Sequence, residues 1–351
     1  MFDLTGDTMS LYTFARRMPK VELHVHLEGA IRPATLLRLA RRNGVRLPVR
    51  DEDELRDFYR FRDFAHFVAV FEMITGCLRT PDDYRLIAYE FGSECARQHV
   101  RYAEVTFTVI SNQRETGLPW ELILEGLNAG RAQARAQFGV DWGWVFDISR
   151  DYPETQGPVL DVALAARDRG VVALGLGGSE ARFPAHLFEQ TFERARQAGL
   201  PRVPHSGEHA GPESMWDTLR LLHADRVGHG VRCVEDPALV DHLRQRRVPL
   251  DMCPTSNVRL GVYPDYAAHP LRRLWDAGLW VTVNSDDPPM FGTDLNREYE
   301  VLIDHFAFGA DELEQVSLNG LRASLLPPAD KARLEAEFRD RFAQLREEEN
   351  V

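Results

Sequence analysis

Two histidines stand one residue apart in an apolar, strand-like run of the sequence. The run reads VELHVHLEG over residues 21–29, and its histidines are His24 and His26. Side chains two residues apart on an extended strand lie on the same face, so both imidazoles point toward one place. The spacing therefore indicates that His24 and His26 share a partner.

Further polar residues occur where later strand-like runs end. They are His205 in PRVPHS, Glu208 just after it, His229 in DRVGHG, and Asp286 and Asp287 after LWVTVNS. Taken singly, such residues are also typical of a core histidine, an ordinary loop or the start of a helix. Unrelated loop residues have no reason to recur at strand ends. The joint pattern therefore favours a zinc site of three imidazoles and one carboxylate. His209 is an alternative to His205, but His205 lies at the strand end itself.

Eight short β-rich runs alternate with longer helical patterns. The runs begin near residues 20, 101, 142, 171, 201, 225, 248 and 279. This alternation predicts an α/β fold, a parallel (β/α)8 TIM barrel, whose chemistry collects at the carboxyl ends of the strands. We expect a single domain over residues 1–351, extra helices inserted after strand one at residues 50–74, and a helical C-terminal tail. A doubly wound sheet is disfavoured, because no glycine-rich phosphate loop follows the first strand.

The composition excludes several classes of protein. The chain has 351 residues, 44% of them hydrophobic and 27% charged, which is typical of a globular protein. A formal net charge of −12 argues against nucleic-acid binding. The four cysteines form no CxxC pair, and we expect reduced thiols in a cytoplasmic protein. We also expect no secretory signal, no membrane span and no membrane partner. The oligomeric state stays open.

The lysine content argues against a second metal ion. Many two-metal hydrolases on this barrel bridge their ions with a carboxylated lysine at a middle strand. Here Lys20 precedes strand one and Lys331 lies in the tail, and these are the only lysines. Glu180 follows strand four by several residues. We therefore expect one Zn²⁺ per chain, which lowers the pKa of a bound water to about 7.

Five segments together resemble the adenosine/adenine deaminase family, a branch of the amidohydrolase barrels that uses one zinc ion. They read KVELHVHLEGAIRP, HSGE, RVGHG, CPTSN and VNSDDPPMFG, and they occur in the family's order over residues 18–297. The resemblance implies hydrolytic deamination at C6 of an adenine-containing small molecule, a purine nucleoside, with release of ammonia.

The resemblance also implies a role for each site residue. Glu208 protonates the purine N1, and His229 orients the attacking water with Asp286. Asp287 bonds N7 and the N–H of Gly178 bonds N3. Asp287 has to be protonated to donate to N7, and an adjacent carboxylate and burial both raise a pKa. Glu208 also has to be protonated, which an apolar purine slot favours. The zinc ligands are His24, His26, His205 and Asp286.

Three positions depart from the family pattern. Ser206 replaces an alanine, and we expect this change to matter little. Glu28 stands where adenosine deaminases commonly carry an aspartate that binds the ribose 5′-hydroxyl, so it is a substrate-binding candidate. Gly175 replaces an aspartate, for which two interpretations stay open. One is a tight strand-to-helix turn, and the other is a site emptied to admit a different nucleoside tail.

The segments GLGGSE and SDDPPMFG resemble most the branch that acts on 6-aminodeoxyfutalosine in menaquinone biosynthesis. That substrate is an adenosine whose 5′ end carries a 3-carboxybenzoyl-type extension. Adenosine, 5′-methylthioadenosine and free adenine remain alternatives as substrates. Two alternatives belong to other functional classes: a binuclear amidohydrolase, and a zinc-binding protein without activity. A substrate carboxylate requires a cation, and the candidates are Arg32, Arg62, Arg79 and Arg182.

Overall fold

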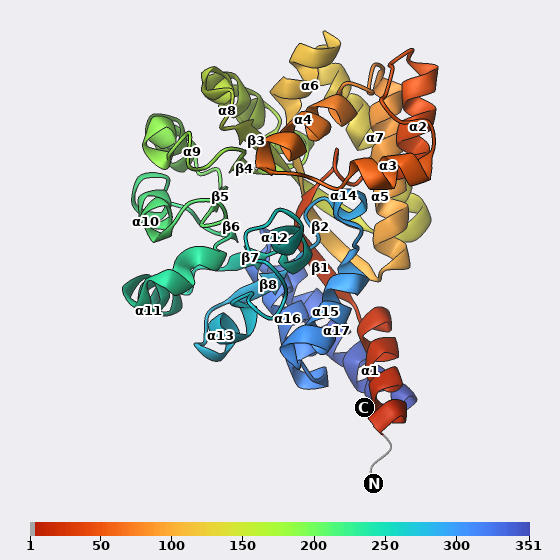
Figure 1. Cartoon of the computed structure of the whole chain (residues 1–351), viewed down its shortest axis with the longest axis vertical. Helices are drawn as coiled ribbons and strands as arrows, with labels where there is room; N and C mark the ends of the chain where they lie inside the picture. Colours follow the sequence, from red (N-terminus) through yellow and green to blue (C-terminus); the bar gives the residue numbers. More distant parts are fainter. Residues whose placement is uncertain (1–3) are drawn as a thin grey trace.

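Eight parallel strands form the centre of the molecule in the computed structural model, which describes residues 4–351, with side chains from residue 10 onward. Neighbouring strands pair in sequence order, and the helices surround them (Figure 1). The predicted TIM barrel is confirmed. The strands are β1 Lys20–His26, β2 Val100–Phe107, β3 Asp141–Ser149, β4 Val171–Gly177, β5 Arg202–Ser206, β6 Val227–His229, β7 Leu250–Met252 and β8 Val281–Val283.

The sheet closes between β1 and the residues that follow β8. Val25 and Asp286 form a parallel bridge. The N–H of His26 donates to the carbonyl of Asp286 at 2.9 Å, and the N–H of Asp286 donates to the carbonyl of His24 at 3.1 Å. The closure therefore holds three polar residues of the predicted site in one backbone ladder.

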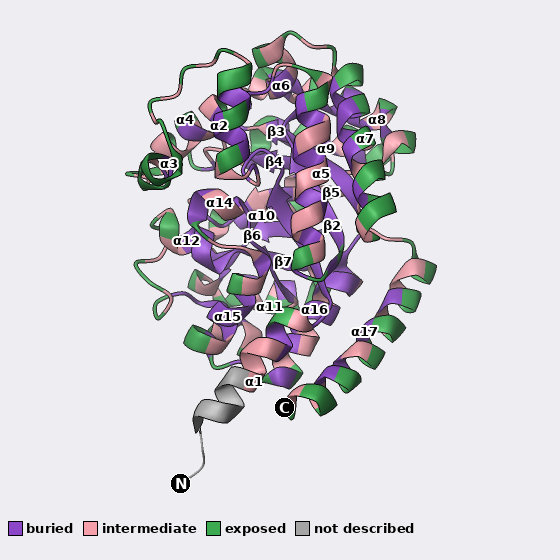
Figure 2. Cartoon of the chain, turned by 90° about the vertical axis from the view of Figure 1, so that its right-hand side faces the viewer, coloured by how far each residue is buried: buried purple, intermediate pink, exposed green. Residues whose placement is uncertain are grey.

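Helices cover the outside of the barrel, with buried residues facing the strands and exposed residues facing outward (Figure 2). The helices between successive strands from β2 to β8 are α6 Val109–Thr116, α7 Trp120–Phe138, α8 Gln156–Ala165, α9 Glu189–Gln197, α10 Pro212–Leu221, α11 Pro237–Arg246, α12 Pro254–Arg259 and α13 Leu271–Asp276. Short 3-10 turns join them at Pro153–Thr155, Arg167–Arg169, Ala185–Phe188 and Val231–Glu235. Within residues 4–351, no helix combines the length and apolar composition that a membrane crossing requires.

The predicted insertion after strand one is present. The predicted residues 50–74 form α3 Glu52–Phe58 and α4 Phe64–Thr75, which lie in the chain between α2 Pro33–Arg42 and α5 Pro81–Arg97. Asp51 and Asp63 cap α3 and α4 by accepting the N–H groups of Glu54 and His66, which explains why these helices start there. Helix α4 lines the pocket at the mouth of the barrel with its phenylalanines.

The predicted helical tail is also present. The helices after β8 are α14 Pro288–Phe291, α15 Leu295–Phe306, α16 Ala310–Ala323 and α17 Pro328–Glu349. Helix α1, Leu4–Arg17, lies beside α17 near the C-terminus (Figure 1). Arg17 forms ion pairs with Glu348 and Glu349, which ties the two ends together.

A buried charge cluster lies at the end of β6 opposite to the predicted site. The guanidinium of Arg226 contacts Glu104 of β2 at 2.7 Å and Asp251 of β7. Its remaining N–H groups donate to the carbonyls of Leu23 and Ala323. All three charged side chains are at most 2% exposed. Arg226 therefore joins three strands and the end of α16.

We expect Arg226→Met to lower the free energy of unfolding by about 3–5 kcal/mol, because two carboxylates lose their buried cation. Urea unfolding followed by circular dichroism measures this change. The matched control is Arg56→Gln, which breaks an ion pair with Asp53 whose side chains are 71% and 91% exposed. That change costs below about 1 kcal/mol. Equal unfolding midpoints for the two variants would show that the buried cluster is not stabilising.

Candidate metal and catalytic site

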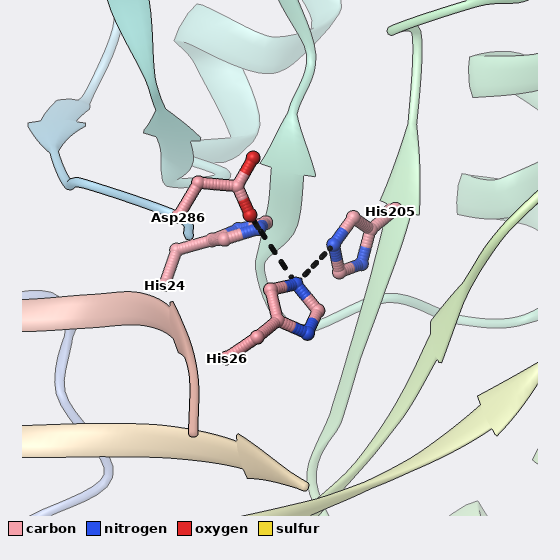
Figure 3. A group of neighbouring side chains, drawn as sticks. All are labelled: His24, His26, His205 and Asp286. Carbon is pink, nitrogen blue, oxygen red and sulfur yellow. Dashed lines mark hydrogen bonds and ion pairs between the residues drawn. The ribbon is translucent and has the colours of Figure 1, made fainter. Parts of the chain in front are cut away.

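Four predicted ligands meet at the carboxyl ends of β1, β5 and β8 (Figure 3). One ligand atom from each of His24, His26, His205 and Asp286 lies within 4.8 Å of all the others. Oδ1 of Asp286 is 3.4 Å from Nε2 of His24 and 3.3 Å from Nε2 of His26. Nε2 of His26 is 3.2 Å from Nε2 of His205. The geometry gives three nitrogen ligands and one carboxylate oxygen around one point.

This cluster fits a zinc ion. Nε2 of His24 is buried and has no hydrogen-bond partner among the residues that the structure describes. The carboxylate and imidazole groups are all directed at the same small space, where a cation satisfies their lone pairs together. Three histidines and one carboxylate form a donor set that suits Zn²⁺.

Two site residues adopt an unusual backbone conformation. The φ angles are +65° for Asp286 and +61° for His229. This left-handed region is unfavourable for residues other than glycine, and such residues concentrate at functional sites. At Asp286 the backbone ladder to β1 maintains the conformation and aims the side chain at the histidines.

A chain of hydrogen bonds fixes the orientation of His229. The N–H of Leu271 donates to Nδ1 of His269 at 3.2 Å, and burial lowers the pKa of His269 to about 3. Nε2 of this neutral ring therefore carries the proton and donates to Oδ1 of Asn257 at 3.0 Å. The Asn257 amide then donates to Nδ1 of His229 at 3.2 Å. A neutral His229 consequently carries its proton on Nε2.

His229 lies between the two carboxylates of the site. Its Nε2 is 3.8 Å from Oε2 of Glu208 and 3.8 Å from Oδ2 of Asp286. Burial lowers the pKa of His229 below its ordinary value, which favours the neutral ring. Cys253 lies close to His229 and Asp286, but burial raises the pKa of its thiol well above the ordinary value. A protonated thiol is a poor metal ligand, so the four-residue cluster is the better metal site.

The surroundings of Glu208 differ from the apolar slot expected from the sequence. Its Oε2 lies 3.1 Å from Nδ1 of His209, whose ring packs on Phe64 of α4 with 4.3 Å between centroids. Burial raises the pKa of Glu208. The neighbouring His229 and His209 have a larger effect in the opposite direction, so the pKa of Glu208 lies below its ordinary value. This environment favours the ionised form of Glu208. His209 contacts the predicted acid and is not part of the metal cluster.

Asp287 has the opposite electrostatic environment. Burial and the charge of Asp286 raise the pKa of Asp287 well above its ordinary value. Its Oδ1 is buried, and the described part of the chain offers it no hydrogen-bond partner. Gly29 makes room for this carboxyl, because a Cβ at that position would lie 1.7 Å from Oδ1 of Asp287. Asp287 therefore presents a protonated carboxyl with unused donor capacity.

These residues line one pocket of about 370 Å³ at the barrel mouth. Gly178 forms part of its wall with a φ of +100°, and a Cβ there would lie 2.6 Å from Oδ2 of Asp151. Phenylalanines of α4 cover one side. Away from the metal cluster, the pocket continues between β2, β3 and α6 to a polar end. The polar residues of that part of the wall are Glu72, Thr75, Thr108, Ser111, Arg114, Glu115, Ser149, Asp151 and Tyr152.

Comparisons with known proteins agree with this geometry. The family model described as Adenosine deaminase matches residues 19–341. The chain belongs to the adenosine deaminase family. It is 41% identical over 332 residues to an aminodeoxyfutalosine deaminase of Streptomyces avermitilis, covering 93% of this chain and 92% of that one. It is 38% identical over 309 residues to an adenine deaminase of Bordetella avium, covering 88% and 97%. The predicted family resemblance is confirmed.

Solved structures show the same fold. An adenine deaminase of Arthrobacter aurescens superposes with a TM-score of 0.88 at 34% identity, covering 92% of this chain and 98% of that one. An amidohydrolase of Burkholderia ambifaria with bound Zn superposes with a TM-score of 0.89 at 29% identity, covering 97% and 95%. This adenosine deaminase family member therefore resembles a structure with bound Zn and has a candidate metal site of its own.

Glu28 does not line the pocket. Its Oε1 accepts the N–H and the hydroxyl of Thr108 at 3.0 and 2.6 Å and the amide of Asn112 at 2.8 Å. Thr108, in turn, lies on the pocket wall. The structure therefore places the predicted substrate-binding carboxylate behind the wall, where it orients Thr108.

Neither sequence-based interpretation of Gly175 describes its position. Gly175 lies inside β4 and pairs with Asp147 of β3, so it is not in a turn. A Cβ at Gly175 would lie 2.5 Å from Oδ1 of Asp147, so the space is filled by that carboxyl and is not empty. Asp147 lines the pocket, and burial raises its pKa to about 7. Sequence reasoning missed Asp147, although an aspartate inside the apolar strand WGWVFDI was a signal.

The predicted arginines do not line the pocket. Arg32 pairs with Glu94, and Arg79 pairs with Glu115. Among the described residues, Arg114 is the only arginine on the pocket wall. Arg62 and Arg182 lie outside it as well.

Proposed function

We propose that this chain hydrolyses the C6 amino group of 6-aminodeoxyfutalosine, releasing ammonia, with one Zn²⁺ per chain. The family membership supports hydrolytic deamination of an aminopurine. The observation that supports the choice of substrate is the polar wall that α4, α6 and β3 add to the pocket of about 370 Å³.

The metal would be held by His24, His26, His205 and Asp286. When bound, zinc supplies a nucleophile at neutral pH by lowering the pKa of a coordinated water to about 7. The only two lysines of the sequence support a single ion. Lys20 lies buried at the start of β1, where its Nζ donates to carbonyls of Arg16, Met18 and Gln98. Lys331 lies in α17.

Asp287 and Gly178 would orient the purine. The raised pKa of Asp287 keeps its carboxyl protonated, so it donates a hydrogen bond to N7, which is an acceptor. The N–H of Gly178 would donate to N3 from the other wall of the pocket. The two donors together fix the ring plane and place C6 toward the metal cluster.

His229 would orient the attacking water, and Glu208 would transfer a proton from that water to the purine. Because Nε2 of His229 carries the proton, the ring donates to the oxygen of the attacking water and orients it. In its ionised form, Glu208 accepts the proton of that water and then delivers it to N1. Protonated N1 makes C6 more electrophilic, and the water oxygen bonds to C6. The remaining proton of that oxygen passes to the amino group, which leaves as ammonia while a C6 carbonyl forms.

The polar end of the pocket would hold the 5′ extension. The guanidinium of Arg114 lies over the ring of Tyr152 at 4.9 Å and contacts Glu154 at 3.0 Å. These contacts fix a cation in a wall that Ser111 and Ser149 also line, together with the carboxylates of Glu72, Glu115 and Asp151. A carboxylated aromatic tail fits a cation with hydroxyl donors around it. Free adenine would leave this part of the pocket filled only by water.

Adenine deaminase is the second candidate function. The similarity to the adenine deaminases of Bordetella avium and Arthrobacter aurescens favours it. Both functions use the same purine contacts, and they differ in whether the polar end is used.

We expect kcat/KM for 6-aminodeoxyfutalosine to exceed those for adenosine, 5′-methylthioadenosine and adenine when deamination is followed by the purine absorbance change. We also expect Arg114→Gln to lower kcat/KM for 6-aminodeoxyfutalosine about 10- to 100-fold, because a hydrogen bond to a charged group contributes about 1.5–3 kcal/mol. The same variant should leave adenine turnover unchanged.

The matched control is Arg182→Gln, since Arg182 lies outside the pocket and stacks on Phe183. It should leave all four substrates unaffected. Adenine as the preferred substrate, with no effect of Arg114→Gln, would select the second candidate function.

A further inference from the structure

Glu180 is a buried carboxylate to which the proposed reaction gives no role. It follows β4 and is only 3% exposed, yet it lies outside the metal cluster and outside the pocket wall. Its hydrogen bonds reach Ser206 at the end of β5, Ser214 in the first turn of α10, and the turn between them, which carries Glu208.

One carboxylate oxygen of Glu180 binds the start of the turn. Oε1 accepts the N–H of Gly207 at 2.7 Å and the hydroxyls of Ser206 and Ser214 at 2.9 and 2.7 Å. Ser206 also accepts the hydroxyl of Thr218 at 3.0 Å. The serine that replaces the family's alanine therefore extends a network centred on Glu180.

The other oxygen of Glu180 binds the rest of the turn. Oε2 accepts the consecutive N–H groups of Glu208, His209 and Ala210 at 3.2, 3.1 and 3.0 Å. In a turn, these N–H groups have no neighbouring strand to accept their hydrogen bonds. A buried N–H without an acceptor lowers the stability of the fold. One side chain thus supplies the acceptor for four successive backbone donors. With six donors bound, Glu180 has no free oxygen for a metal ion.

The turn itself is tight. Gly207 has a φ of +68°, and a Cβ there would lie 2.3 Å from Sδ of Met215. The backbone from His205 to Glu208 therefore has little conformational freedom, and Glu180 lies on the inner side of the turn.

Arg150 holds the residue before the turn. Its side chain is fully buried, and Nη2 donates to the carbonyl of His205 at 2.9 Å. Nη1 donates at 2.6 Å to the carbonyl of Phe183, which belongs to the same segment after β4 as Glu180. Arg150, which follows β3, thus links the carbonyl of the candidate metal ligand His205 to the segment after β4 that carries Glu180.

We propose that Glu180 is a positioning residue that sets the place of Glu208 relative to His205. This inference rests on the proposed function, in which Glu208 moves a proton to the purine while His205 holds the metal. Glu180 touches neither substrate nor metal and acts through the backbone of Gly207–Ala210. A displacement of about 1 Å in such a group costs about 100-fold in rate.

The test compares Glu180→Gln with wild type as the full zinc-loaded chain. The new amide N–H groups face backbone N–H groups, so part of the network is lost. We expect kcat for 6-aminodeoxyfutalosine to fall about 100-fold, with KM within about threefold and zinc content unchanged. Hydrogen exchange should accelerate at least about tenfold at amides 207–210 and stay unchanged in β1.

The controls are Ser206→Ala and Ser214→Ala, which each remove one hydroxyl and leave the four backbone donors bound. Both should keep kcat within about threefold. Glu180→Asp serves as the second variant if Glu180→Gln does not fold, and its shortened carboxylate should cost about tenfold in kcat. Wild-type kcat and exchange in either folded Glu180 variant would overturn the inference. A wild type that deaminates no adenine compound would instead overturn the proposed function, and the exchange measurement would still test the turn.

Discussion

Glu208→Gln should lower kcat for deamination about 100- to 10,000-fold. Glutamine keeps the size and shape of the side chain but cannot accept a proton from water and pass it to N1. Zinc content should stay at the wild-type level, because Glu208 is not among the four clustered ligands. Steady-state kinetics and metal analysis on the same preparation measure both quantities.

The control for Glu208→Gln is Glu213→Gln, which makes the same chemical change at an exposed position in the first turn of α10. Its activity should equal that of wild type. Full activity in Glu208→Gln would reject Glu208 as the proton carrier. Loss of zinc in that variant would mean that the carboxylate supports the metal cluster, which the distances do not predict.

The metal cluster could be predicted because each ligand lies in a short local pattern. Alternation along β1 places His24 and His26 on one face, and a polar residue after an apolar strand points to the barrel mouth. His205 and Asp286 follow that second pattern. The barrel fold supplied the missing information, since it brings the carboxyl ends of distant strands together.

Residues whose role depends on a neighbouring strand could not be predicted. Asp147 occupies the pocket because Gly175 and Gly177 of β4 leave space beside it, and this depends on the register between β3 and β4. Glu180 was noted only as an acid near strand four. Its six donors lie about 26–34 residues further along the chain, and no local pattern connects them with it.

The direction in which a side chain points could not be predicted from the sequence either. Arg32 and Arg79 were candidates by charge alone, and their pairing with other carboxylates removes them from the pocket. Arg114 reaches the pocket because α6 begins directly after β2. The sequence shows that His209 follows Glu208, but only the fold turns its ring back toward that carboxylate and lowers the pKa of Glu208.

The adjacent aspartates divide two tasks through their environments. Histidines surround Asp286 and lower its pKa well below the ordinary value despite its burial, which suits a metal ligand. Asp287 faces the space beside Gly29, where burial and the charge of Asp286 raise its pKa. In the proposed function, Asp286 would be ionised within the candidate metal cluster and Asp287 would be protonated to bind the purine.

Asp287→Ala should therefore lower kcat/KM at least about 100-fold while zinc content stays at the wild-type level. The variant lacks the donor to N7, so the purine is no longer held in the reactive orientation. Asp286→Ala should lose both activity and zinc, because it removes the only carboxylate of the metal cluster. Metal analysis after dialysis and kinetics on the same samples separate the two outcomes.

Asp287→Asn distinguishes a hydrogen-bond donor at this position from a negative charge. Asparagine has nearly the shape of aspartate and keeps an N–H donor, so it should retain most of the activity that alanine loses. If Asp287 worked through a negative charge, asparagine would fail as alanine does, since its amide offers a donor and an acceptor but stays neutral. Loss of zinc in Asp287→Ala, with zinc retained in Asp286→Ala, would mean that the two aspartates exchange roles. The protonation state of one buried carboxyl thus becomes measurable through a pair of substitutions at a single position.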